Sequence, residues 1–141
     1  MKKLLILLLL FAAPVHAGSL IVGEVQDAYF ESEAGTNRDE FMRFIGNYVS
    51  GTRDAWGYHM MKMNHESLTR KGLPYTEATA GPMNKLITDC MPKSTKLIMM
   101  VLGTDEVKYN TEVSQYIWEK LTGCWATATD AAIKEQQKER T

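Results

Sequence analysis

Between Phe41 and Met63, apolar side chains recur at intervals of three and four residues, the spacing of one face of an α-helix. At 100° per residue they fall within a stripe that covers about half of the helix circumference. The pattern predicts a helix over residues 38–64, roughly 40 Å long, with a kink or break near Gly57. A stripe of this kind must be buried against other helices, so the spacing favours a helical fold. The stripe consists of Phe41, Phe44, Ile45, Tyr48, Val49, Ala55, Trp56, His59, Met60 and Met63.

Three glycines stand inside this helical pattern, although each is expected to cost up to about 1 kcal/mol relative to alanine. On the same helical wheel, Gly46, Ser50 and Gly57 share the back of the helix, and Gly51 lies at the border of the stripe. We call Gly46, Ser50 and Gly57 the glycine lane, because a second backbone can come close there. The occupant could be another helix of the chain, a second copy of the protein or a different partner. The candidate partner-binding residues are the lane and its neighbours: Gly46, Ser50, Gly51, Arg53, Asp54 and Gly57.

The segments around the long helix read as shorter helices and loops. We expect an irregular or short helical lead-in over residues 18–35, and a capping box formed by Thr36 and Asp39 at the start of the long helix. Residues 66–82 contain two glycines and two prolines and read as a loop. A short helix over residues 83–90 would then have Pro82 in a permitted first-turn position and would stop before Pro92.

The C-terminal third predicts two more helices. The densely apolar run 96–103 follows a capping Ser94 or Thr95 and ends at Gly103. The last helix begins at Asn110 or Thr111, runs through Leu121 and ends at Gly123. The fold class is therefore all-α, a small bundle of four or five helices with one disulfide. The helical domain spans residues 18–125, and the polar tail 126–141 is expected to be a frayed helix or disordered.

The first seventeen residues resemble a secretory signal peptide. Lys2 and Lys3 precede an apolar run, residues 4–13, that is too short to span a bilayer, and Val15-His16-Ala17 fits the small-x-small rule of signal peptidase. We expect cleavage after Ala17 and a periplasmic protein with no membrane attachment once the signal is removed. The alternative is a membrane anchor, for which no stop-transfer pattern follows the run.

The chain has two cysteines, Cys90 and Cys124. In an exported protein an even number of cysteines favours a disulfide, and closing a loop of this length contributes about 4 kcal/mol in the loop-entropy model. The alternatives are a buried pair of free thiols and a redox pair, although the spacing lacks the C-x-x-C arrangement.

The charge balance and the motif content exclude some function classes. Without Lys2 and Lys3 the chain has 14 basic against 17 acidic residues, and a weakly acidic chain gains little from phosphate backbones, so no nucleic-acid partner is expected. The acids are scattered, and no G-x-S-x-G, H-E-x-x-H or phosphate-binding loop is present. We therefore expect no enzyme, no catalytic residues and no cofactor.

The segment HMMKMNH, residues 59–65, raises an alternative, because histidine and methionine together suit copper or silver. On the helical wheel, His59 and Met63 point to the apolar front, whereas Met61 and His65 point to the back. At most two ligands converge on one helix, so the low-ranked metal ligands are His59 and Met63. The competing interpretation is that the methionines fill irregular gaps in the core.

Three short motifs resemble the Rap/Tai family of periplasmic immunity proteins of bacterial type VI secretion systems. The motifs are YVSGTRDA over residues 48–55, CMP over residues 90–92 before an apolar helix, and GCW over residues 123–125 after the last helix. The family usually has another cysteine about three residues before the tyrosine, where this chain has Ile45. The matching residues are Tyr48, Gly51, Asp54, Ala55, Cys90, Pro92 and Cys124.

This resemblance implies a small helical protein, often a homodimer, that binds and neutralises a toxin delivered into the periplasm, such as a peptidoglycan amidase. A second resemblance is to the acid-stress periplasmic chaperones of the Hde type, which are also small, exported and helical with two cysteines. Such chaperones would act by dissociating at low pH to expose apolar surface. In this chain, the carboxylates that would lose their charge as the pH falls include Asp39, Glu40, Asp54 and Glu112.

Overall fold

The computed structural model describes residues 20–32, 36–103 and 109–139. The predicted signal peptide lies outside these residues. Within them the chain forms five helices and no strand, which confirms the all-α fold class. The helices are α2 (Val22–Glu31), α3 (Thr36–Arg70), α4 (Glu77–Asp89), α5 (Ser94–Leu102) and α6 (Val113–Glu139).

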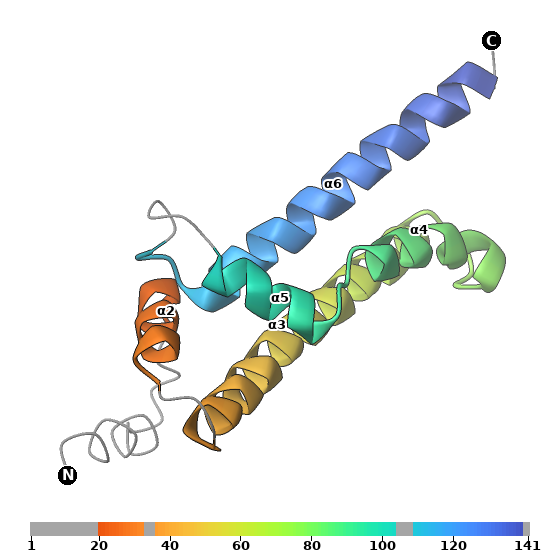
Figure 1. Cartoon of the computed structure of the whole chain (residues 1–141). Coiled ribbons are helices and arrows are strands. Elements are labelled where there is room, and N and C mark those ends of the chain that lie inside the picture. The colour runs from red at the N-terminus through yellow and green to blue at the C-terminus, as the bar shows by residue number, and fades with distance from the viewer. Residues whose placement is uncertain (1–19, 33–35, 104–108, 140–141) are drawn as a thin grey trace.

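Helices α4, α5 and α6 are arranged around α3, and each of them contacts it. Figure 1 shows α4 beside the C-terminal part of α3, α5 over its middle, and the C-terminal end of α6 projecting away from the other helices. Helix α2 packs against α5. None of the helices in the described ranges combines the length and the apolar content needed to cross a lipid bilayer.

The core forms where α3, α5 and α6 meet. Trp56 of α3 is the largest fully buried side chain, with no exposed surface. Burying such side chains stabilises the fold by about 1.5–3 kcal/mol each, and it explains why helices of modest intrinsic stability hold together. The core also includes Val22, Val25, Ile45, Val49, Met60, Ile87, Cys90, Leu97, Ile98, Val101, Val113, Tyr116, Ile117 and Leu121.

Hydrogen bonds across the fold fix the starts of α2 and α6. The amide of Val22 donates to the Thr111 carbonyl at 2.9 Å, and the amide of Val113 donates to the Leu20 carbonyl at 2.7 Å. These bonds satisfy donors that a helix start leaves without intrahelical partners. Nearby, the Tyr109 hydroxyl bonds to the Asp27 carboxylate, which raises the pKa of Tyr109 above its usual value because the bond favours the protonated phenol.

Two boundary predictions around α3 were wrong. Helix α3 runs without interruption through Gly57 to Arg70, so neither a break at Gly57 nor a loop beginning at residue 66 is present. Helix α4 begins at Glu77, and Thr76 caps it by accepting a bond from the Thr79 amide. Pro82 therefore lies in the second turn of α4 rather than at its start. There it removes one intrahelical bond, the one that an amide at this position would donate to the Ala78 carbonyl.

The boundary prediction for the last helix was also wrong. Helix α6 continues through Gly123 and Cys124 to Glu139, across most of the predicted tail. The Trp125 indole donates to the Met83 sulfur of α4 at 3.3 Å, so contacts distant in sequence hold the helix beyond the glycine. Such tertiary contacts outweigh the cost of about 1 kcal/mol that one glycine imposes. By contrast, α5 ends at Leu102 with Gly103 as its C-cap, as predicted.

Candidate functional site

The glycine lane of α3 is filled by the chain itself. A Cβ built on Gly46 would lie 3.7 Å from the Ile98 side chain, and one built on Gly57 would lie 2.5 Å from the Met91 sulfur. The Ser50 hydroxyl bonds to the Ser94 hydroxyl, at the start of α5. The lane is therefore where α5 and the connection before it approach α3, which is the first of the three occupants considered from the sequence.

The buried face of α3 explains this outcome. On a wheel at about 100° per residue, Gly57 is only about 60° from Met60, which is buried. The lane and the neighbouring part of the apolar stripe thus form one buried face. The other edge of the stripe is exposed at Phe44, Ala55 and His59, and Phe44 keeps 44% of its surface in solvent. Met63, in the middle of the stripe but near the end of the predicted helix, keeps 48%. The prediction that the whole stripe is buried was wrong for Phe44, Ala55, His59 and Met63.

Arg53, Gly51 and Asp54 complete the predicted partner-binding set. The Arg53 guanidinium donates to the Pro92 carbonyl at 3.1 Å and pairs with Asp54 at 2.8 Å. Asp54 is mostly exposed, and nothing lies within 4 Å of a Cβ built on Gly51. Partner binding through Gly51 and Asp54 stays a prediction, because neither residue is covered by the described part of the chain.

Leucine substitutions at the two kinds of glycine should have different effects. Gly57→Leu is expected to lower the free energy of unfolding by about 1–3 kcal/mol, because its side chain has to displace Met91 from a packed site. Gly51→Leu should leave the stability unchanged or raise it by up to about 1 kcal/mol, because it removes a helical glycine where space is open. Urea unfolding of both variants measures the difference. Equal stabilities would show that the lane is not packed.

The disulfide joins the end of α4 to the middle of α6. Cys90 is the C-cap of α4 and is buried, whereas Cys124 lies on the exposed side of α6. Their Cα atoms are 5.8 Å apart. A few residues earlier, the Trp56 indole donates to the Thr122 hydroxyl at 3.1 Å where α3 and α6 cross. Residues 118–125 of α6 are therefore held at a fixed position by covalent and non-covalent contacts.

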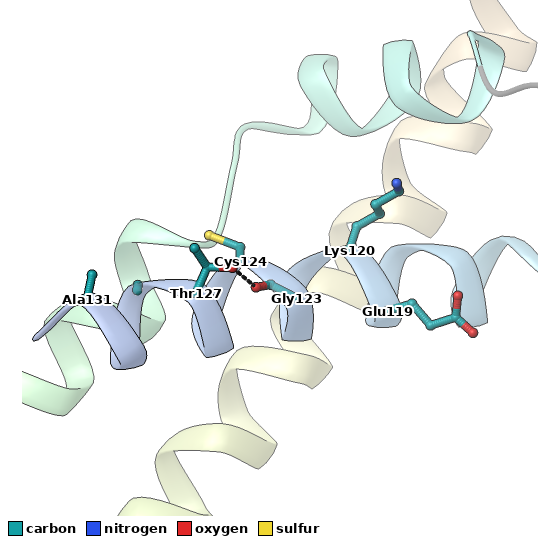
Figure 2. Close-up of a pocket in the computed structure, with 7 residues that line it drawn as sticks. Glu119, Lys120, Gly123, Cys124, Thr127 and Ala131 are labelled. Carbon is teal, nitrogen blue, oxygen red and sulfur yellow. Dashed lines mark hydrogen bonds between the residues drawn. The ribbon is translucent and has the colours of Figure 1, made fainter. Parts of the chain in front are cut away.

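Beside the disulfide, α6 presents a shallow hollow that is open to solvent. Figure 2 shows its labelled residues in successive turns of the helix, with the Cys124 sulfur directed toward the connection before α5. In the same view the Lys120 and Glu119 side chains point to different sides of the helix. We call this surface the α6 groove; it is lined by Glu119, Lys120, Gly123, Cys124, Thr127, Ala128 and Ala131.

The floor of the α6 groove is poor in side chains. Gly123, Thr127 and Ala131 recur at four-residue spacing, and nothing lies within 4 Å of a Cβ built on Gly123. The Thr127 hydroxyl donates to the Gly123 carbonyl at 3.0 Å, so it folds back on its own helix. The sequence pattern did not predict this surface, because the last helix was expected to end at Gly123. The signal was the continuing four-residue spacing of small residues.

The two histidines among the described residues lie outside the core. The His59 ring contacts the Trp118 ring of α6 with 5.6 Å between centroids, and the His65 ring contacts the Tyr75 ring at 5.0 Å. Both histidines are exposed. Across the described residues, no three His, Cys, Asp or Glu side chains are grouped so that they could hold a metal ion.

Comparisons of the chain with protein-family models, curated proteins and solved structures found no match. The resemblances to the Rap/Tai family and to the Hde-type chaperones therefore stay predictions. The same holds for the periplasmic location and for the absence of catalytic activity.

Proposed function

We propose that this protein is an exported immunity-type protein that binds and neutralises a secreted effector, and that the effector docks on the α6 groove. The observation that carries the proposal is the open, side-chain-poor surface of Gly123, Thr127 and Ala131 beside the disulfide. A surface of small residues leaves room for a partner to approach the helix closely. At the glycine lane of the same protein, the side chains of Ile98 and Met91 occupy such a space.

The rigidity of the groove supports the proposal. Binding costs less free energy when the surface is already ordered in the conformation that the partner needs. Here the Cys90–Cys124 disulfide and the bond between Trp125 and Met83 hold the groove against α4. At its N-terminal end, Glu119 and Lys120 provide one charge of each sign, as in the polar rim of many interfaces.

The resemblance to the Rap/Tai family supports the effector as the partner. It implies a periplasmic toxin, for example a peptidoglycan amidase, and an exported chain would meet such a toxin in the periplasm. The signal-peptide pattern of residues 1–17 agrees with that location. A second copy of the chain is the competing occupant of the groove.

A contact-dependent competition experiment tests the function. A strain lacking the gene is mixed with its secretion-competent parent, and survival is compared after complementation with wild type, Gly123→Leu or Gly51→Leu. Both glycines have open space at the Cβ position, so both variants should fold. We expect wild type to restore survival and Gly123→Leu to fail, because its side chain occupies the groove. Gly51→Leu tests the competing prediction that the partner binds at Gly51, and it should protect if the effector docks on the α6 groove. Immunoblots of periplasmic extracts check that the proteins are equally abundant.

A second pair of variants repeats the test on α6 alone. Ala131→Arg places a long charged side chain in the groove, whereas Ile133→Arg changes an exposed residue on another side of the same helix. Only Ala131→Arg should abolish protection. If the deletion strain survives contact as well as its parent, the immunity function is wrong. If both groove variants protect fully, the effector docks elsewhere. Sedimentation of the pure protein shows whether these variants disrupt a homodimer instead.

A further inference from the structure

A second exposed surface lies where α3 passes Trp118 of α6. His59 and Met63 are four residues apart on α3, so their side chains lie on the same face of the helix, with Cβ atoms about 6 Å apart. Both are exposed, with 48% of the Met63 surface in solvent. Neither ring nitrogen of His59 has a hydrogen-bond partner among the described residues, and its ring lies against Trp118.

The chemistry of these three side chains selects one class of ligand. A thioether is a soft donor that prefers Cu(I), and a neutral imidazole also coordinates copper. Cu(I) is a d10 ion that two ligands can hold, so it does not need the group of three His, Cys, Asp or Glu side chains that the described residues do not form. An aromatic ring within about 6 Å attracts a cation over its face, and the Trp118 ring is 5.6 Å from the His59 ring.

We propose that His59 and Met63 form a binding site for Cu(I), covered on one side by the indole of Trp118. The imidazole nitrogen and the thioether sulfur are the two ligands, and the contact with Trp118 holds the imidazole in place. On the helical wheel of α6, Trp118 points about 140–180° away from the residues of the groove floor. The site is therefore separate from the surface proposed for the effector.

A second histidine provides the matched comparison. Met61 and His65 have the same spacing in reverse order, and the His65 ring contacts Tyr75. However, Met61 is partly buried and packs against the core, so its sulfur is less available to an ion. A site that requires an exposed thioether should form at His59 and not at His65.

The experiment is an anaerobic titration of the mature protein with Cu(I) in competition with a chromogenic Cu(I) chelator. Trp118 reports on the site, because a bound ion should quench its fluorescence. We expect one equivalent bound with a dissociation constant below micromolar, weakened by about tenfold or more in His59→Asn and in Met63→Leu. His65→Asn should bind as wild type does. Trp118→Phe should lose the quenching and bind several-fold more weakly.

All four variants change exposed residues, and circular dichroism confirms that each one is folded. Affinity weaker than micromolar in the wild type overturns the proposal. Affinity that is unchanged in both His59→Asn and Met63→Leu also overturns it, as does an equal loss in His65→Asn. Because the readout is metal binding and fluorescence, the result does not depend on the immunity function.

Discussion

Replacing Trp56 with alanine is expected to lower the free energy of unfolding by about 3–5 kcal/mol. Trp56 has no exposed surface and is the largest of the fully buried side chains. Its removal leaves a cavity between α3 and α6 and takes away the indole donor of the Thr122 hydroxyl. A loss of this size is a large share of the stability of a single domain. Urea unfolding followed by far-ultraviolet circular dichroism measures it.

Two milder variants separate the packing from the hydrogen bond. Trp56→Phe keeps an aromatic ring in the core but has no donor for Thr122, whereas Thr122→Val removes the acceptor and keeps the indole. Because deletion of a large core side chain adds a cavity, both variants should retain more stability than Trp56→Ala. If Trp56→Ala costs less than about 1 kcal/mol, the crossing of α3 and α6 is not the centre of the core.

Removing the disulfide should have an effect of similar size. The Cys90→Ser, Cys124→Ser double variant is expected to be about 4 kcal/mol less stable, because the bond closes a loop with a sequence separation of 34 residues. The loss should appear first in α6 beyond Cys124. Without the disulfide, this part of α6 is held to α4 by the weaker bond between Trp125 and Met83. Amide hydrogen exchange should therefore speed up more over residues 125–139 than in α3.

Chemical reduction of the wild type gives the matched control for this prediction. The reduced wild type and the double variant should unfold at similar urea concentrations, since both lack the same cross-link. The oxidised wild type should resist a clearly higher concentration. If reduction leaves both the unfolding midpoint and the exchange rates of α6 unchanged, the bond does not stabilise the fold or hold the groove.

Local signals in the sequence predicted several features correctly. The spacing of apolar residues predicted the long helix α3, and Gly103 marked the end of α5. The export pattern and the two cysteines predicted the bond between Cys90 and Cys124. The two helix features depend on residues that are close in sequence. The disulfide was predictable because the chain has only two cysteines.

Other features depended on contacts that a helical wheel does not contain. The wheel gave the position of Gly57 on α3 correctly, but it could not tell that Met91 would cover it. Likewise, the exposure of Met63 follows from where α6 crosses α3, between Trp56 and Thr122. A glycine lane and an apolar stripe next to each other on one helix can be buried together when several helices pack on it.

By itself the sequence determined that this chain forms helices, which faces of them are apolar or small, and which two sulfurs are joined, because these properties arise from local periodicity and from a single cysteine pair. Only the tertiary structure decided that the lane on α3 is closed and that the corresponding surface on α6 is open. The reason is that α5 covers one face of α3, where its Ser94 and Ile98 meet Ser50 and Gly46. Helix α6 continues past α5 and is held to α4 by Cys124 and Trp125.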